Sequence, residues 1–459
     1  MKDKNMEFPK SFVWGAAAAS YQIEGAAAED GRGPSVWDMF CRKPGVIRSG
    51  ENGDVACDHY HRFKEDVALM KQIGLKAYRL SIAWPRLIPA GTGKVNPPGL
   101  AFYDALVDEL LSAGIQPYVT LFHWDFPYEL YLRGGWLNPD SPDWFADYTR
   151  VVVDHLSDRV SYWMTLNEPQ CFIGSGHRDG DDAPGDRLGW SECLLAAQHA
   201  LLAHGKAVQV IRASARQTPA VGIAPVGITY IPASDSPADI AAARQAMFSV
   251  SRQDFWNNTW WSDPIFFKRY PEDGLALFGR AAPVYTAQDM ELIGQPLDFY
   301  AANIYHGITV RAGADGQAQP VPSPTGMASS AYPWPVTPQA LYWGPRFLWE
   351  RHHLPILITE NGMANADWVA LDGQVHDPQR IDFTARYLAA IGQAMRDGVD
   401  VAGYFHWSIM DNFEWTYGYL LRFGLIYVDF NTQQRLLKDS ALWYAQVIAS
   451  NGSSLPELA

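Results

Sequence analysis

Residues 142–168 read PDWFADYTRVVVDHLSDRVSYWMTLNE, and this stretch shows how the chain is built. In its first part, apolar residues recur three or four positions apart, which predicts a helix over Pro142–Leu156. Its second part, Val160–Leu166, is a short run of β-branched, aromatic and apolar residues that predicts a buried strand. A helix followed closely by a buried strand is typical of an α/β protein.

Similar units recur along the whole chain. The seven other predicted strands are Phe12–Ala17, Ala77–Ile82, Gln116–Phe122, Val221–Pro225, Leu297–Ala302, Pro355–Thr359 and Val401–Trp407. The other predicted helices are His61–Ile73, Leu100–Ala113, Glu192–Arg212, Pro338–His352 and Pro378–Asp397. Alternating β and α units predict a (β/α)8, or TIM, barrel. Because no Gly/Ser/Pro-rich linker interrupts the pattern, we expect a single domain over residues 1–459.

The most irregular stretch is Ala312–Val336, which follows the sixth predicted strand. We expect it to be a long βα loop over the active-site mouth, because such loops lie on the catalytic face of a barrel. The alternative is a disordered surface insertion, given its Gly, Ala, Pro and Ser content. Trp334 favours the loop at the mouth.

Charge and composition exclude several classes of partner. The formal charge of −14 repels nucleic acid and anionic lipid, and no Lys/Arg-rich run overrides it. The charged start Met1–Lys10 leads into Phe12–Ala19 without a cleavage pattern, and no apolar run is long enough to cross a bilayer. We therefore expect a cytoplasmic protein with neither nucleic-acid nor membrane partners. The oligomeric state stays open, a homo-oligomer included.

The cysteines predict neither a metal site nor a disulfide scaffold. They lack the paired short spacings of zinc ligands and are too few for a disulfide framework. We expect reduced core residues at Cys41, Cys57, Cys171 and Cys193, and no metal or cofactor.

Two glutamates follow predicted strands directly. Glu168 stands in Asn167-Glu168-Pro169 after the fourth strand, and Glu360 stands in Thr359-Glu360-Asn361-Gly362 after the seventh. Barrel catalysis takes place at the carboxyl ends of the strands. Paired carboxylates there suit glycoside hydrolysis, in which one carboxyl protonates the leaving oxygen and the other attacks or activates water. A single glutamate at a strand end would more often be an ion-pair partner.

Six separated motifs give a specific resemblance. They are FVWG with SYQIEG (residues 12–15 and 20–25), YRLSIAWPR (78–86), TLFHWD (120–125), TLNEP (165–169), ITENG (358–362) and WSIMDNFEW (407–415). In this order they resemble glycoside hydrolase family 1, the β-glucosidase family, from Phe8 to about Tyr444. The resemblance implies a retaining β-glucosidase that removes terminal β-glucosyl residues from small glucosides and cello-oligosaccharides.

The resemblance also implies roles for individual residues. Glu168 would be the acid/base, Glu360 the nucleophile, and Arg79 and Tyr305 the partners that keep Glu360 ionised. Asn167 would reach the sugar 2-hydroxyl. The implied substrate-binding residues are Gln22, His123, Trp124, Asn167, Trp334, Trp407, Glu414, Trp415 and Phe423. A carboxylate at Glu414 would repel a 6-phosphate, which favours unphosphorylated sugars.

The sequence departs from the family pattern at two places. Asp182 stands where an aromatic residue or histidine is usual before Ala-Pro-Gly, and Ile304 stands where a second tyrosine is common. Both departures affect the preferred leaving group more than the hydrolysis itself.

Other functions stay open at this point. A β-galactosidase or β-fucosidase would use much the same inner residues. A metal-dependent amidohydrolase is the enzymatic rival, because His59-Tyr60-His61 has the spacing of two metal ligands, although these residues directly precede a predicted helix. A non-catalytic carbohydrate-binding barrel would keep the tryptophans but would need neither Arg79 nor both glutamates.

Overall fold

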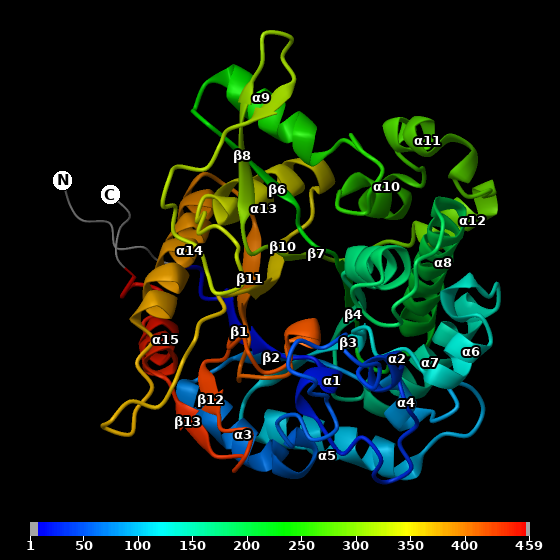
Figure 1. The fold of residues 1–459 in the computed structure, drawn as a ribbon, viewed down its shortest axis with the longest axis vertical. Helices are drawn as coiled ribbons and strands as arrows, with labels where there is room; N and C mark the ends of the chain where they lie inside the picture. The colour runs from blue at the N-terminus through cyan, green and yellow to red at the C-terminus, as the bar shows by residue number, and fades with distance from the viewer. Residues whose placement is uncertain (1–7, 456–459) are drawn as a thin grey trace.

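The computed structural model describes residues 8–455, so residues 1–7 and 456–459 of the predicted domain, with most of the charged start, lie outside it. Eight parallel strands form its centre, and helices surround them (Figure 1). In spatial order the strands are β5 (Ala220–Ala224), β4 (Tyr162–Asn167), β3 (Gln116–Phe122), β2 (Ala77–Ser81), β1 (Val13–Ala17), β11 (Val401–Trp407), β10 (Ile356–Asn361) and β7 (Tyr300–Asn303).

The sheet closes on itself between β5 and β7. The backbone N–H of Asp298 donates to Val221 O over 2.9 Å, and that of Asn303 donates to Pro225 O over 3.1 Å. The N–H of Gly227 donates back to Asn303 O over 2.8 Å. These bonds join the two outer strands, so the predicted barrel is confirmed.

Six of the long helices that cover the barrel agree with the predicted ones, and the last of the following seven was not predicted. They are α3 (His59–Ile73), α5 (Pro97–Ser112), α7 (Ser141–Leu156), α8 (Trp190–Ser214), α13 (Ala340–His352), α14 (Pro378–Arg396) and α15 (Asp439–Ala449). Shorter helices lie in the connections: α1 (Ser20–Ile23), α2 (Val36–Phe40), α4 (Trp84–Leu87), α6 (Tyr128–Leu132), α9 (Pro237–Met247), α10 (Thr259–Phe267), α11 (Glu272–Phe278) and α12 (Ala287–Ile293).

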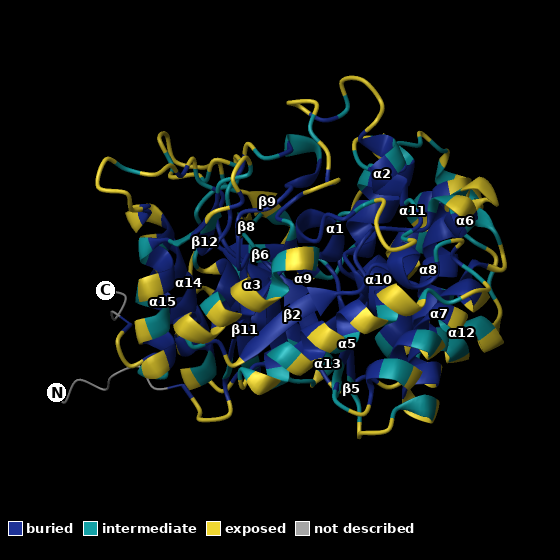
Figure 2. Ribbon diagram, turned by 90° about the horizontal axis from the view of Figure 1, so that it is seen from below, coloured by how far each residue is buried: buried dark blue, intermediate teal, exposed yellow. Residues whose placement is uncertain are grey.

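Successive side chains of each strand point to opposite faces of the sheet, and this produces two apolar layers. In β4, Trp163 points out into the layer between strands and helices, whereas Met164 belongs to the cluster inside the barrel, with Ala77 and Phe405. Trp163 and Met164 are both fully buried. Figure 2 shows the barrel strands buried and the helices exposed along their outer faces. Both faces of the sheet are covered, which is why the strands read as nearly continuous apolar runs.

A second, small sheet was not predicted. The strands β6 (Thr229–Pro232) and β8 (Gly307–Ala312) pair in parallel, and β9 (Ala318–Pro320) pairs antiparallel to β8. The strand β9 lies within Ala312–Val336, so the first part of that stretch is a hairpin and not an irregular loop. Its last part, with Trp334, lies at a cleft described below.

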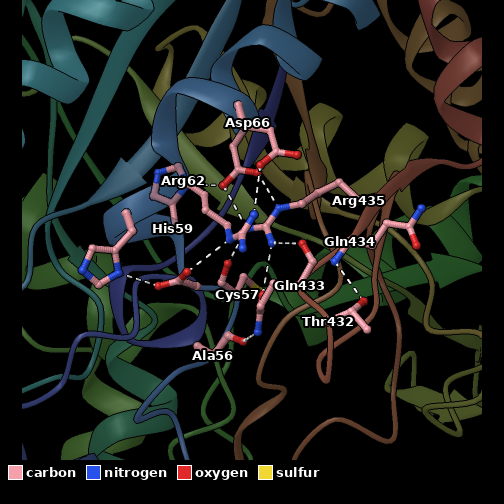
Figure 3. Close-up of polar contacts among 12 residues, drawn as sticks. Ala56, Cys57, His59, Arg62, Asp66, Thr432, Gln433, Gln434 and Arg435 are labelled. Carbon is pink, nitrogen blue, oxygen red and sulfur yellow. Dashed lines mark hydrogen bonds and ion pairs between the residues drawn. The ribbon is translucent and has the colours of Figure 1, made fainter.

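A buried ion pair fastens the C-terminal part of the chain to α3 (Figure 3). The guanidinium of Arg435, in β13 (Arg435–Leu437), donates through Nε to Asp66 Oδ1 over 2.9 Å. Asp66 Oδ2 also bonds Nδ1 of His59 over 2.7 Å. Arg435 Nη1 donates to Gln433 O over 2.6 Å, and Nη2 bonds Cys57 O. The hairpin of β12 (Ile426–Val428) and β13 is thereby fixed to the barrel wall.

The four cysteines are free and buried, as expected. Among residues 8–455 no helix is both long and apolar enough to cross a membrane.

Candidate active site

Glu168 and Glu360 open into one cleft at the carboxyl ends of the barrel strands. Glu360 lies in the last part of β10, and Glu168 follows the last residue of β4. Of the residues predicted for the site, the following line this cleft: His123, Trp124, Glu168, Tyr305, Trp334, Glu360, Trp407, Glu414 and Trp415. The other predicted residues do not line the cleft but contact residues that do. They are Gln22, Arg79, Asn167 and Phe423.

Glu360 is held by a cation and a phenol. Arg79, from β2, donates through Nη1 to Glu360 Oε1 over 2.5 Å, and Tyr305 OH donates to Oε2 over 2.8 Å. Burial raises the pKa of Glu360, whereas Arg79 and the hydroxyl of Tyr305 oppose that rise. Because Arg79 is itself only 1% exposed, its charge is poorly screened and favours the ionised form of Glu360.

Glu168 has a different environment. Its Oε1 accepts from Asn303 Nδ2 over 2.9 Å, and its Oε2 accepts from Cys171 Sγ over 3.2 Å. Burial first, and then the negative charge of Glu360, raises the pKa of Glu168 to about 8. The two neutral donors lower it only in part. Near neutral pH Glu168 therefore keeps its proton while its neighbour is ionised.

Asn167 bonds one side chain that contacts Glu360 and another that contacts Glu168. Its Oδ1 accepts from Arg79 Nη2 over 2.6 Å and from Asn303 Nδ2 over 3.0 Å, and its Nδ2 contacts His123 Nε2 at 3.1 Å. These bonds fix the orientation of the Asn167 amide at the floor of the cleft.

The backbone turns sharply after β4. Glu168 has φ of 44°, in the left-handed region that non-glycine residues seldom adopt. The π-helix η2 (Gln170–Asp179) follows directly and carries Cys171 beneath Glu168. Strained residues and π-helical turns concentrate at functional sites, and here they aim the carboxyl of Glu168 into the cleft.

Glu414 and Gln22 form a second polar group in the same cleft. Gln22 Nε2 donates to Asn412 Oδ1 over 3.0 Å and lies 3.5 Å from Glu414 Oε2, and its Oε1 has no partner within residues 8–455. Burial, then Glu360 and Glu168, raise the pKa of Glu414 to about 8. A buried amide oxygen without a partner and a carboxyl group together suit a hydroxylated ligand.

Aromatic rings surround these polar groups. Trp407, at the end of β11, stacks on His123 with 5.8 Å between ring centroids and 18° between planes. Trp334 lies 4.8 Å from the Tyr305 ring, and Phe423 lies 6.2 Å from it. Trp124 packs on Trp415 at 4.5 Å. Such a rim of rings around a few polar groups is typical of sugar-binding clefts.

Comparison with known sequences decides the family. A sequence profile described as glycosyl hydrolase family 1 matches residues 4–453.

The chain belongs to glycosyl hydrolase family 1. The resemblance seen in the sequence motifs is thereby confirmed, and so is the prediction of a glycoside hydrolase.

Several relatives match this family 1 enzyme over nearly their whole length. A 1,4-β-D-glucan glucohydrolase of Thermotoga neapolitana is 42% identical over 451 residues, which cover 97% of this chain and 99% of the relative. An aryl-phospho-β-D-glucosidase of Bacillus subtilis is 41% identical and covers 98% of each chain. The solved structure of a β-glucosidase from Thermotoga maritima in complex with glucoimidazole is 42% identical, with a TM-score of 0.89 over 97% of this chain and all of that one.

Sequence reasoning missed two side chains that contact Glu168 in this family 1 enzyme. Asn303 ends β7, and its Oδ1 accepts from Thr359 Oγ1 over 2.7 Å. Because Asn303 directly follows the predicted strand Leu297–Ala302, the strand-end rule could have found it. Cys171 gives no such signal, since a lone cysteine in an apolar segment reads as core.

The histidines considered as metal ligands have structural partners instead. His59 begins α3, is buried and bonds Asp66. His61 is exposed and bonds Asp58 Oδ1 over 2.6 Å. Over the described part of the chain, no cluster of three His, Cys, Asp or Glu side chains suits a metal ion.

Proposed function

We propose that this family 1 enzyme is a retaining β-glucosidase that hydrolyses terminal β-glucosyl residues, with Glu360 as nucleophile and Glu168 as acid/base. The observation that carries the proposal is the unequal environment of the two carboxyls. Glu360 bonds the guanidinium of Arg79, whereas Glu168 bonds only neutral donors. Double displacement requires this difference, because one carboxyl must attack as an anion while the other donates a proton.

In the first step Glu360 attacks the anomeric carbon, and Glu168 protonates the departing oxygen. The bond between that oxygen and the anomeric carbon breaks as the ester to Glu360 forms. Esterification removes the negative charge of Glu360, which raises the pKa of Glu168 while it is present. Glu168 therefore becomes a stronger acid in the glycosyl-enzyme, and its ionised form can accept the proton of the attacking water. Water releases the sugar with its configuration retained.

Gln22 and Glu414 would bind the outer hydroxyls of the sugar, with Trp407 beneath its C–H face. Asn167 would bond the 2-hydroxyl, a contact that strengthens in the transition state. His123, Trp124 and Trp415 complete the sugar pocket.

Unphosphorylated sugars fit this pocket better than 6-phosphosugars. The acidic groups that raise the pKa of Glu414 are Glu360, Glu168 and Asp182. Glu360 is ionised even when Glu168 keeps its proton, so a phosphate beside Glu414 would be repelled by that charge. The relatives named for glucan and glucoside hydrolysis support this choice, and the aryl-phospho-β-D-glucosidase among the relatives makes it worth testing directly. Trp334 and Phe423 would contact the leaving group and the sugar rim. The cytoplasmic location and the oligomeric state stay predictions.

The nucleophile can be tested by chemical rescue. We expect Glu360→Gly to lose on the order of 10⁴-fold or more in kcat. Added azide should restore turnover and give the α-glucosyl azide, detected by NMR of the anomeric proton. As a matched control, Glu168→Ala with azide should give the β-glucosyl azide, because azide then attacks the glycosyl-enzyme. Undiminished hydrolysis by Glu360→Gly would refute the assignment and favour a different mechanism.

A non-catalytic carbohydrate-binding barrel and a metal-dependent hydrolase make different predictions. The first would bind glucosides without turning them over. The second would lose activity on exhaustive chelation, whereas we expect kcat to be unchanged by a chelator. Comparing aryl β-glucoside, β-galactoside, β-fucoside and 6-phospho-β-glucoside in one assay identifies the preferred sugar.

A further inference from the structure

Asp182 is a carboxylate in the cleft that the proposed mechanism does not use. It lines the cleft together with Ser175 and with Cys171, whose thiol bonds Glu168. Within residues 8–455 its side chain has no hydrogen-bond or ion-pair partner, whereas the nearby Asp186 accepts bonds from two side chains. Asp182 is half-buried, so its carboxylate is left for water or for a group on the ligand to bond.

The loop that carries Asp182 is held firmly against the π-helix η2. The N–H groups of Asp181 and Asp182 both donate to Ser175 O, over 2.9 and 3.2 Å. A Cβ on Gly176 would lie 2.5 Å from Ala183 O, so this close approach needs glycine. The position of Asp182 is therefore fixed before a ligand arrives.

Further bonds anchor the far end of the same loop. His177 Nδ1 bonds Asp186 Oδ2 over 2.8 Å, and Tyr131 OH donates to Asp186 Oδ1 over 2.8 Å. The ammonium group of Lys43 donates through Nζ to the carbonyl of Pro184 over 2.8 Å. This bond goes to the backbone of the loop and not to a carboxylate. A rigid, preorganised group contributes more to specificity than a mobile one, because less ordering accompanies binding.

No cation pairs with the carboxylate of Asp182 within the described residues. Burial, and then Asp181, raise the pKa of Asp182 to about 7. The titratable groups that face it from the other elements are the thiol of Cys171, the phenol of Tyr332 and the carboxyl of Glu414. Each of these is neutral or negative, and the guanidinium of Arg252, which also lines the cleft, pairs with Asp254. A positive group on the ligand would therefore be the first cation to bond Asp182.

We propose that Asp182 is a specificity residue that selects leaving groups carrying a protonated amine. The inference rests on the proposed function and adds the chemical class of leaving group. Asp182 would accept the N–H bonds of the ammonium group while Glu168 protonates the glycosidic oxygen. The ammonium would favour the ionised form of Asp182 and satisfy a carboxylate that has no partner in the described chain.

Three aryl β-glucosides of similar size separate charge from leaving-group acidity. They carry 4-(2-aminoethyl)phenyl, 4-(2-hydroxyethyl)phenyl or 4-(carboxymethyl)phenyl groups, in which methylene groups insulate the phenol oxygen from the charge. At pH 8 we expect kcat/KM for the amine to exceed that for the neutral analogue about tenfold, and the carboxylate to be the poorest substrate. The ratio of amine to neutral substrate should fall as the pH decreases through about 7, because Asp182 then becomes protonated. Protonation of Glu168 affects both substrates alike and cancels in the ratio.

Asp182→Asn should bring the ratio of amine to neutral substrate close to one at every pH, whereas Asp182→Glu should keep most of the preference. Asp181→Asn is the matched control, because Asp181 is the adjacent but exposed carboxylate, and at pH 8 its ratio should stay as in the unaltered enzyme. Because Asp181 raises the pKa of Asp182, the fall of the ratio should move to a lower pH in this variant. A preference that survives in Asp182→Asn, or that vanishes equally in Asp181→Asn, would overturn the proposal. Hydrolysis of all three glucosides without charge preference would defeat this inference alone, whereas hydrolysis of none would defeat the proposed function.

Discussion

Glu168 is the residue whose role depends most on the leaving group. A poor leaving group such as the glucose of cellobiose needs protonation, whereas a dinitrophenolate leaves without it. For Glu168→Ala we expect kcat/KM to fall about 10²- to 10⁴-fold on cellobiose and about tenfold or less on a dinitrophenyl glucoside. Steady-state kinetics on both substrates checks this expectation. Equal losses would contradict the acid role.

Cys171 offers a probe of the acid's protonation. Glu168 must be protonated to act as the acid, so kcat/KM should fall as the pH rises through its pKa of about 8. The thiol of Cys171 donates to the carboxylate and lowers that pKa. Cys171→Ala should therefore move the alkaline limb of the pH profile upward by about half a unit. Cys193→Ala, which removes another buried free cysteine, should leave the limb in place, and a downward shift in Cys171→Ala would contradict the assignment.

The sequence pattern placed Glu168 and Glu360 in the site because one follows a strand and the other ends one. Arg79 lies in the middle of β2, and only the family resemblance pointed to it. The sequence motifs did not predict that Asn303 bonds both Glu168 and Asn167, since this contact joins the ends of β7 and β4, which lie on either side of β5. Periodicity describes one element at a time, and the contact between these side chains depends on how the barrel closes between β5 and β7.

The ends of β10 and β11 approach each other so closely that one position admits only glycine. A Cβ on Gly362 would lie 1.8 Å from Trp407 O. Gly362→Ala should push apart the strand ends that carry Glu360 and Trp407. We expect a loss of about 1–3 kcal/mol in stability and a fall in kcat at saturating substrate. Denaturant unfolding and kinetics measure the two effects.

Gly313→Ala is the control for this change. There the Cβ would meet the flexible side-chain amide of Gln319, which can move away. We expect its stability and kcat to stay near those of the unaltered enzyme. If Gly362→Ala behaved the same way, the close contact would have no role in placing Glu360.

Among the elements, the eight barrel strands could be predicted because sheets covered on both faces require continuous apolar runs. The small sheet of β6, β8 and β9 could not. The burial of β8 repeats every third residue, so it shows neither the continuous apolar run nor the two-residue alternation that identifies a strand. It pairs in parallel with β6, which is far away in the sequence. The π-helix η2 could not be predicted either, because its repeat differs from the 3.6-residue periodicity that identifies helices.

For the molecule as a whole, the ion pair between Arg435 and Asp66 links a late segment to the first long helix. Burial raises the pKa of Asp66, but the bonds to His59 and Arg435 outweigh it and lower the pKa below its usual value. The stability from this carboxylate is thus present above the pKa of the unfolded chain, about 3.9, and is lost as the pH falls through the lower folded pKa. Removing the cation leaves a buried charge uncompensated.

Arg435→Met should accordingly lower the free energy of unfolding at pH 7 by about 3–5 kcal/mol. The deficit should shrink as the pH falls from 7 to 5, because without Arg435 the buried carboxyl of Asp66 takes up a proton at a less acidic pH, and protonation removes the uncompensated charge. Arg386→Met is the matched control: its pair with Asp382 on α14 is exposed, and its loss should stay below about 1 kcal/mol. Denaturant unfolding followed by tryptophan fluorescence at pH 7 and pH 5 measures both variants. If Arg435→Met cost no more than Arg386→Met, the C-terminal hairpin would be held by apolar packing alone, and the buried ion pair would not stabilise the barrel.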